Sequence, residues 1–345
     1  MAINRLGETT LTVYSELLDQ LRGSALIPQS GSFVSKAIGG TSYWYVQRTD
    51  GGRRRQIYLG AESPELLATI ARSEDARRSL KEEESRRREL VTMLVAGGMA
   101  SEKATVAGVL TILADSGLFR AGAVLVGTQA FACIANMLGV RFEQQSLRTA
   151  DVDVAQRAIG VGIGEMRTDI LEELRASDPR FVAVPELDPR QPSTSFKVRG
   201  RDLRVDLLTP GSREGARPVL LPHLNAAAQP LPGLGYLLGE TAEALIVAAA
   251  GILVYVPAPA AFALHKLWVA GRRNVSENLK ARKDMRQSAQ VLEVLLEDRP
   301  DDLRKAWRRL PASMAAGVRR SARRLDRGLS AALGLVVKDA ALSRR

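Results

Sequence analysis

The stretch from residue 244 to residue 264, ALIVAAAGILVYVPAPAAFAL, runs for 21 residues without a charged side chain. A helix of that length would be long enough to span a lipid bilayer. Its second half contains Pro257 and Pro259, and proline breaks the interiors of helices and of central strands. We therefore predict two short buried strands or a strand pair, then a loop at VPAPA and a helix, in a protein that does not enter the membrane.

The overall composition is that of a globular protein, and the chain is long enough for two or three packed units. The chain has 345 residues, of which 46% are apolar and 25% are charged. The one cysteine, Cys133, excludes a disulfide framework and fits a reducing compartment. No charged and then apolar leader opens the chain, so we expect no signal peptide and a cytoplasmic protein.

The net charge of +11 is concentrated near the C-terminal end of the sequence. Residues 301–345 contain 12 Lys and Arg but only 4 Asp and Glu. Such a basic end is typical of a protein with a polyanionic partner such as nucleic acid. It is equally typical of helices whose basic faces are only solvated, and the sequence leaves both interpretations open.

Residues 1–98 form the first of three predicted regions and contain a helix at 10–23 and a β-hairpin. The hairpin is predicted around Asp50-Gly51-Gly52, because Asp-Gly and Gly-Gly tolerate the positive φ of a tight turn. Aromatic residues and arginines mix within it: Tyr43, Trp44, Tyr45, Tyr58, Arg48, Arg53, Arg54 and Arg55. This mixture can stack bases and neutralise phosphates. Aromatic cross-strand pairs also stabilise a small hairpin, and we favour that structural role.

A long charged helix is predicted to follow the hairpin, over residues 63–96. Ser63 is a good N-cap, Pro64 fits the first helical position, and Gly97-Gly98 can end the helix. Its middle is almost entirely charged, so we expect it to be exposed, as an arm or as a partner-binding helix.

The second region, residues 99–250, alternates helical and strand-like segments. Helices are predicted at 101–117, 128–139 and 164–177, and strands at 122–128, 150–156 and 202–210. This order predicts an α/β (α+β) fold with a small mixed sheet and flanking helices. The third region, residues 251–345, is predicted to be a helical domain with helices at 259–273, 277–298 and 302–310, followed by the basic tail.

Two aspartates interrupt the apolar strand TADVDV. Side chains at i and i+2 of a strand point to the same face, so Asp151 and Asp153 are expected to project together. Two carboxylates held that close repel each other unless a cation or a proton lies between them. An Asp-x-Asp pair alone occurs about once by chance in a chain of this length. On a rigid strand it is nevertheless a natural pair of oxygen ligands for Mg²⁺.

A third carboxylate, Asp206, lies in another apolar strand, LRVDLL. If that strand adjoins the first, three aspartates meet at one edge of the sheet. Two-metal phosphoryl transfer uses such an arrangement.

Gly127 and Thr128 lie where a buried strand runs into a helix. A glycine lets the backbone approach a ligand closely, and the N–H groups at the start of the helix can bind phosphates. Each of these residues alone also has an ordinary structural explanation: Gly127 as a turn glycine, Thr128 as an N-cap, and the aspartates as exposed residues at a strand end. The order of the glycine and threonine before the aspartate pair is what predicts a nucleoside triphosphate site.

This order of motifs resembles the DNA polymerase β-like nucleotidyltransferase superfamily. The superfamily pattern is an apolar residue, Gly, then Gly or Ser, followed by Asp-apolar-Asp/Glu and a later strand Asp. The matching residues are Val126, Gly127, Thr128, Asp151, Val152, Asp153 and Asp206. The segments GTQAF, TADVD, VPAPAAFALHKL and KARKDMRQ resemble a bacterial branch of largely uncharacterised or abortive-infection-type members. The resemblance covers most of residues 30–295.

Two departures separate this chain from the superfamily pattern. Thr128 stands where Gly or Ser is usual, and 22 residues separate it from Asp151, which is longer than the usual dozen or so. The gap contains Arg141 and Arg148, and we expect it to help shape the nucleotide site.

The resemblance implies a metal-dependent transfer of a nucleoside monophosphate from an NTP, such as ATP, to a hydroxyl, with release of pyrophosphate. Asp151 and Asp153 would hold two Mg²⁺ (or Mn²⁺) ions, and Asp206 would complete the catalytic metal site and help to deprotonate the acceptor. Gly127, Thr128 and Lys266 would hold the phosphates.

Four further residues near Lys266 are weaker candidates. His265 could carry a proton, but a single helical histidine is more often structural. Arg272, Arg273 and Lys283 could bind phosphate, although a solvated helix face is the expected role of each.

The acceptor is not defined by the sequence. A nucleic-acid 3′ end, for example that of a tRNA, fits the basic tail and the hairpin, whereas a protein hydroxyl or a small molecule fits the core equally well. The alternative class is a non-catalytic nucleic-acid-binding or toxin–antitoxin or phage-defence module that keeps the fold. The three aspartates argue against that alternative, because a binding module gains nothing from clustered carboxylates.

Overall fold

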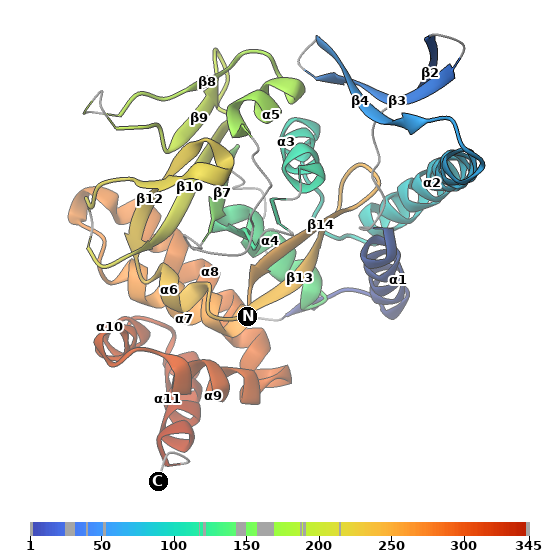
Figure 1. Cartoon of the computed structure of the whole chain (residues 1–345). Helices are drawn as coiled ribbons and strands as arrows, with labels where there is room; N and C mark the ends of the chain where they lie inside the picture. Colours follow the sequence, from blue (N-terminus) through green and yellow to red (C-terminus); the bar gives the residue numbers. More distant parts are fainter. Residues whose placement is uncertain are drawn as a thin grey trace.

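The computed structural model of the chain describes residues 3–24, 32–38, 41–50, 53–116, 118–119, 122–142, 150–156, 169–186, 188, 191–213 and 215–342. These residues form a mixed α and β structure in which a central sheet is flanked by helices (Figure 1). The C-terminal helices lie at one end of the molecule, and the N-terminal elements lie along its side. The predicted α/β (α+β) fold class is confirmed.

The central sheet has seven strands in the described part of the chain. They are β5 (Val124–Val126), β7 (Asp151–Ala155), β8 (Phe181–Ala183), β9 (Ser195–Val198), β10 (Arg204–Gly211), β11 (Val219–Leu221) and β12 (Ala226–Pro232). The main order is β11-β12-β10-β7-β5, and β9 pairs with β10 and β8. Strand β10 runs parallel to both β7 and β12, whereas β5 is antiparallel to β7. The sheet is therefore mixed, as the sequence predicts.

Three helices next to this sheet correspond to the predicted ones: α3 (Ala104–Asp115), α4 (Gly127–Met137) and α5 (Ile170–Ser177). The short helix α6 (Leu234–Leu237) was not predicted. Helix α4 contacts β5 and β7, and its side chains from Ala130 to Ala135 are buried. The first residues of the helix predicted at 164–177 lie outside the described residues, and α5 begins at Ile170 with Asp169 as its N-cap.

The uncharged stretch at 244–264 folds as predicted into a strand pair and a helix. Strands β13 (Thr241–Ile246) and β14 (Ile252–Pro257) pair antiparallel, and α7 (Pro259–Ala270) starts two residues later with Pro259 in its first turn. The alternate buried side chains of β14, such as Val254 and Val256, fill the core. Among the described residues, no helix is long and apolar enough to cross a membrane.

The third region is helical, as predicted. Besides α7 it contains α8 (Asn278–Asp298), α9 (Pro300–Arg309), α10 (Ala312–Ala322) and α11 (Arg327–Leu342). The basic tail is thus two packed helices, α10 and α11. Their apolar sides join the main core through buried residues: Met314, Val318, Leu333 and Val336. The predicted boundaries at 98 and 250 stay predictions, and the β13–β14 pair lies across residue 250.

The N-terminal segment is attached to the side of the core. Strand β1 (Asn4–Arg5) pairs with β6 (Val140–Arg141), and α1 (Glu8–Ser24) packs against α2 (Pro64–Ala96). These two helices share a small apolar cluster with the β13–β14 pair, and it includes Leu17, Leu94 and Leu245. The prediction for α2 is confirmed at both ends, because the hydroxyl of Ser63 accepts the N–H of Leu66 and Gly97 caps the C-terminus.

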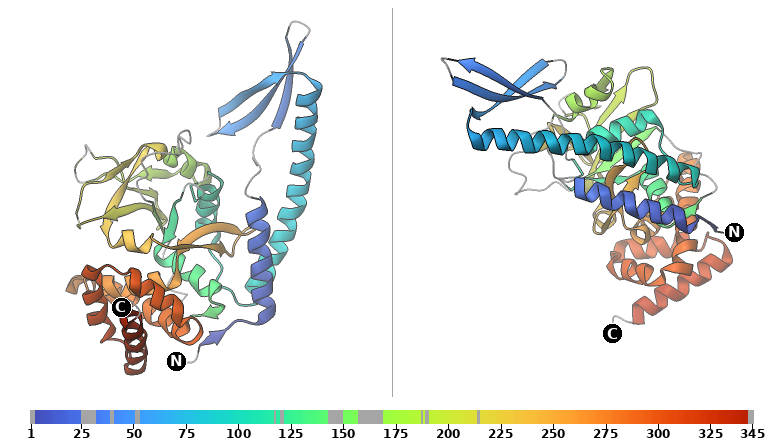
Figure 2. Two further views of the ribbon diagram at one scale, coloured as in Figure 1. Left: turned by 60° about the horizontal axis from the view of Figure 1, so that its bottom comes forward. Right: turned by 90° about the vertical axis from the view of Figure 1, so that its right-hand side faces the viewer.

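A three-stranded antiparallel sheet lies at the far end of α2, away from the core (Figure 2). It consists of β2 (Ser32–Ile38), β3 (Thr41–Asp50) and β4 (Arg53–Ala61). The β3–β4 hairpin confirms the sequence prediction, whereas β2 was not predicted. Trp44 donates its indole N–H to a carboxylate oxygen of Glu62 at 3.0 Å, which is a structural use of one aromatic residue. The turn glycines and the side chains of the other hairpin residues named above, Tyr43 excepted, lie outside the described part.

Candidate active site

The three predicted aspartates lie on adjacent strands of the central sheet. Asp151 and Asp153 are on β7, and Asp206 is on its parallel neighbour β10, directly opposite Asp153 in the strand register. Arg204 is opposite Asp151. Because paired residues of neighbouring strands point to the same side of a sheet, the three carboxylates and the Arg204 guanidinium share one face. Val152 and Val205, which lie between them on the two strands, are buried.

Burial and mutual repulsion change the titration of the β7 carboxylates. Burial, and then the negative charge of Asp206, raises the pKa of Asp153 to about 6, against the opposing influence of Lys266 and Lys283. The pKa of Asp151 is also raised by burial and by Asp206, and is opposed mainly by Arg204. Burial is the main cause of both shifts and the charge of Asp206 is the second, so a bound cation would relieve the repulsion among the carboxylates.

Arg204 is the nearest compensating cation and was not predicted from the sequence. Its Nε donates to Oδ1 of Asp206 at 2.7 Å. Within the described residues, no three His, Cys, Asp or Glu side chains are grouped so that they could hold a metal ion between them. The predicted metal site of three aspartates consequently stays a prediction.

Gly127 and Thr128 start α4 directly after β5, as predicted, next to the carboxylates. Gly127 has a φ of +67°, and a Cβ at this position would collide with Oδ2 of Asp153. Only glycine therefore lets the turn pass over the carboxylate. No side chain caps the first turn of α4, where the preceding residue is Val126. Backbone N–H groups at such a helix start can bind an anion.

Basic side chains from α7 and α8 complete the site. Lys283 donates from Nζ to Oγ1 of Thr128 at 2.9 Å, and burial, with the nearby charge of Lys266, lowers the pKa of Lys283. Lys266 contacts Oδ1 of Asp284 at 2.7 Å, and Nε of Arg273 contacts Oδ2 of the same carboxylate at 2.7 Å. Burial opposes ionisation of Asp284, but these two cations hold its pKa below its usual value.

The structure thus brings six of the predicted site residues together: Gly127, Thr128, Asp151, Asp153, Asp206 and Lys266. Arg148 lies outside the described residues. The prediction that Lys283 and Arg273 lie on a solvated helix face is wrong, because Lys283 contacts Thr128 and Arg273 contacts the buried Asp284. Asp284 and Arg204 were missed, since the only sequence signal for Arg204 is its position two residues before Asp206 on the same strand.

His265 is a buried structural residue, as expected. Burial, with the positive charge of Lys266, lowers its pKa to about 3, so its imidazole stays neutral at physiological pH. Arg272 is also not in the site, because its guanidinium lies over the ring of Trp268, 4.8 Å from the centroid.

Comparison with known proteins gives two family matches. A domain of unknown function (DUF6788) matches residues 10–68, from within α1 through the three-stranded sheet to the start of α2. No curated protein and no solved structure matches the chain. A family described as nucleotidyltransferase matches residues 104–312, which is more than half of the chain and includes the carboxylate strands, α7 and α8. The match indicates transferase activity, and the chain belongs to this nucleotidyltransferase family.

Proposed function

We propose that the protein is a Mg²⁺-dependent nucleotidyltransferase of the 2.7.7 type, and that it belongs to a bacterial branch of the DNA polymerase β-like superfamily. It transfers a nucleoside monophosphate from an NTP to a hydroxyl and releases pyrophosphate. One observation supports this most directly: β7 and β10 present Asp151, Asp153 and Asp206 on one face, beside the uncapped start of α4.

The chemistry of the donor atoms at this face suits Mg²⁺ or Mn²⁺, and binding would require the three carboxylates, which are not grouped around one point in the described structure, to converge on the ion. All three side chains are carboxylates, the hard oxygen ligands that Mg²⁺ prefers in proteins. Burial, with the charge of Asp206, raises the pKa of Asp153 to about 6, so a bound cation would favour its ionised form. Asp151, Asp153 and Asp206 would hold the metal, which when bound neutralises phosphate charge and lowers the pKa of a coordinated hydroxyl.

Two parts of the protein are placed to bind the triphosphate. The backbone N–H groups at Gly127 and Thr128 offer uncharged donors, while Lys266 and Lys283 offer positive charge from α7 and α8. Asp284 fixes Lys266 by direct contact. Phosphates carry most of the negative charge of an NTP, so these groups orient it and bring its α-phosphate to the carboxylates. Arg148 remains a proposed nucleotide-binding residue.

In the proposed reaction, the acceptor hydroxyl oxygen forms a bond to the α-phosphorus while the bond from that phosphorus to the pyrophosphate oxygen breaks. Asp206 accepts the hydroxyl proton. Arg204, which donates to Asp206 at 2.7 Å, keeps this carboxylate oriented. The protein performs little covalent chemistry, so positioning and charge stabilisation provide the rate enhancement.

We propose a polynucleotide 3′ end, such as that of an RNA, as the acceptor. The net charge of +11 supports this choice over a neutral small molecule.

The test is transfer of label from each α-labelled NTP to cellular RNA, purified protein or small-molecule acceptors in the presence of Mg²⁺. The wild type should label one acceptor class, and an Asp151→Asn/Asp153→Asn variant should lose at least 100-fold of that activity. Asp202→Asn is the matched control, because Asp202 lies close enough to influence Asp151 but is not on the carboxylate strands. The control should keep most of the activity. Equal labelling by the wild type and the double variant, or no labelling of any acceptor, would rule out the proposed function.

A further inference from the structure

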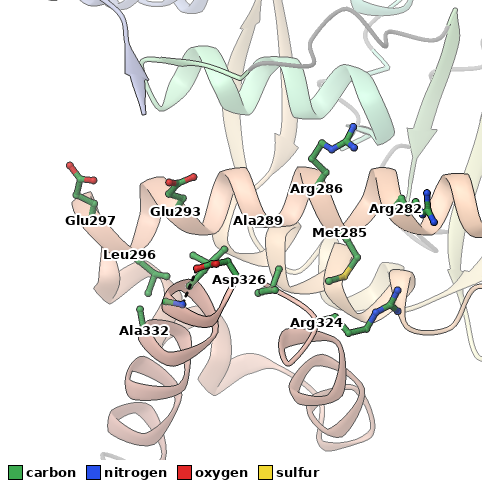
Figure 3. Close-up of a pocket in the computed structure, with 13 residues that line it drawn as sticks. Arg282, Met285, Arg286, Ala289, Glu293, Leu296, Glu297, Arg324, Asp326 and Ala332 are labelled. Carbon is green, nitrogen blue, oxygen red and sulfur yellow. Dashed lines mark hydrogen bonds between the residues drawn. The ribbon is translucent and has the colours of Figure 1, made fainter. Parts of the chain in front are cut away.

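A cavity of about 830 Å³ lies between α8 and the segment that joins α10 to α11 (Figure 3). This volume is in the range of pockets that hold a small organic ligand or a few linked groups. The cavity lies outside the carboxylate face described above, and no part of the proposed triphosphate site lines it.

One end of the cavity is basic. Figure 3 shows Arg282 on α8 and Arg324, between α10 and α11, at this end, whereas the side chain of Arg286 points to the other side of α8. Both Arg282 and Arg324 are exposed, and neither forms an ion pair within the described part of the chain. Guanidinium groups without an internal carboxylate partner are available to bind phosphate, which they can contact through two N–H groups at once.

The floor of the cavity is apolar and half-buried. It is formed by Met285 and Leu296 of α8 together with Leu325 and Leu329 across from them. Aliphatic and thioether side chains at this degree of exposure can cover the faces of bases or the carbon atoms of riboses. The floor and the basic end together match a ligand that alternates anionic and flat apolar groups.

Two of the acidic residues at the cavity are already engaged. Glu297 is paired with Arg5 at 2.7 Å, and Asp326 accepts the backbone N–H of Gly328 at 2.9 Å. Glu297 lies at the end opposite Arg282 and Arg324 (Figure 3). The local charge therefore favours an anion at the arginine end, and it limits how far a polyanion extends toward Glu297.

Helix α8 connects this cavity to the proposed active site. Lys283, which follows Arg282 directly, donates to Thr128 at the start of α4. The basic side chains of consecutive residues thus reach the triphosphate site on one side of the helix and the cavity on another. The proposed active site and the cavity therefore adjoin the same stretch of α8, on different sides of the helix.

From these observations we propose that the cavity is the acceptor-strand subsite. It binds the single-stranded end of a polynucleotide, with phosphates at Arg282 and Arg324 and with bases or riboses on Met285 and Leu329. This inference rests on the proposed function, because it names the substrate that the nucleotide is transferred to.

The first test measures binding without turnover. A fluorescein-labelled 12-nucleotide RNA, and a DNA of the same sequence, are titrated with the full-length protein in the absence of NTP and divalent cations, and fluorescence anisotropy is recorded. The Arg282→Gln/Arg324→Gln variant should bind about tenfold more weakly than the wild type. Its slope of log K against log salt should be less steep by about 1.4, for two lost phosphate contacts to a single strand.

The matched control removes the same charge from α10 and α11, outside the cavity. Arg320 on α10 and Lys338 on α11 are exposed and do not line the cavity, so Arg320→Gln/Lys338→Gln should stay within about twofold of the wild type. An oligonucleotide with a 4-thiouridine near its 3′ end should crosslink to peptides that contain Met285 or Leu329.

Three results of the binding assay would overturn the inference: equal affinities of the cavity variant and the wild type, equal losses in the two double variants, or no binding of either oligonucleotide by the wild type. A wild-type dimer that the cavity variant makes monomeric would assign the cavity to self-association, and would overturn it as well. The labelling assay separates the two proposals. Strand binding through the cavity without nucleotide transfer overturns the proposed function and leaves the cavity a polynucleotide-binding site without an acceptor role, whereas transfer that the cavity variant performs as well as its control overturns the subsite alone.

Discussion

Asp153 lowers the stability of the folded protein when it is ionised, yet the proposed chemistry needs it in the ionised form. It lies under the Gly127 turn, opposite Asp206, and burial raises its pKa to about 6. In the unfolded chain an aspartate titrates near 3.9. Between these two pH values the unfolded chain loses this proton while the folded protein keeps it, so this residue makes the folded state less stable as the pH rises from about 4 to about 6.

Asp153→Asn should therefore stabilise the metal-free protein at neutral pH. The gain in the free energy of unfolding should be up to about 3 kcal/mol above pH 6.5, since the pKa is raised by about two units. It should disappear below pH 4, where the carboxyl group is neutral in both states. Urea denaturation from pH 3.5 to pH 8 measures this difference. A gain that does not depend on pH would contradict the assigned cause.

The residues of the site differ in how far the sequence could reveal them. The aspartates could be predicted because period-two spacing in a strand fixes which side chains share a face. Lys283 could not be assigned, because its contact with Thr128 joins residues 155 positions apart. Locally it lies in a charged helix whose basic side chains look solvated. Asp284 was missed for the same reason, since only the packing of α8 on α7 reveals that it is buried.

At the scale of elements, the contact between α7 and α8 determines where the basic side chains lie. Asp284 is only 3% exposed and bridges Lys266 of α7 and Arg273, which follows that helix. Ser288, one turn further along α8, donates to the backbone carbonyl of Ala263 at 2.8 Å. The two helices are thus joined by polar contacts at fixed positions, and these contacts hold Lys266 toward the carboxylate face.

Asp284→Asn should strongly weaken the contact between α7 and α8. Removing one member of a buried ion pair leaves uncompensated charge, so the free energy of unfolding should fall by about 3 kcal/mol. Glu277→Gln is the control, because it removes a more exposed partner of Arg273 and should cost less than about 1 kcal/mol. Chemical denaturation of both variants at pH 7 and low salt measures the difference. Similar losses in the two variants would contradict the structural role of Asp284.

Helices and strands whose ends are marked by residues in the sequence could be predicted. Short strands that form only by pairing with neighbouring strands could not. Ser63, Pro64 and Gly97 delimit α2 in the sequence as they do in the structure. Strands β8, β9 and β11 have only three or four residues each, which is too short for an alternating pattern to be distinguished from a loop. They are formed by pairing with their neighbours in the sheet.

In the whole molecule, the N-terminal segment is attached at two places. Arg5 binds Glu297 and Asp298 at the C-terminal end of α8, through exposed ion pairs of small energetic value. The apolar cluster that includes Leu17 and Leu94 provides the stronger attachment, because both residues are fully buried.

Leu94→Ala should loosen the attachment of the N-terminal segment to the core. It should lower the free energy of unfolding by about 2–5 kcal/mol, as large-to-small core substitutions do. Leu67→Ala, on the same helix at a position 39% exposed, is the control and should cost less than about 1 kcal/mol. Thermal unfolding measures the loss, and hydrogen exchange of the α1 amides measures the loosening. Unchanged exchange in α1 would show that the helix is held elsewhere.

The length of α2 has a mechanical consequence for the three-stranded sheet. Leu94, in the apolar cluster, and Ile70, near the sheet, are 24 residues apart on one continuous helix. At the rise of an α-helix this separation is about 36 Å. The helix therefore acts as a lever, and a rotation of about 5° at the cluster moves its far end by about 3 Å. Small rocking motions at the base become large displacements of the sheet, so its position relative to the carboxylate face is set by how tightly a few leucines pack at the other end.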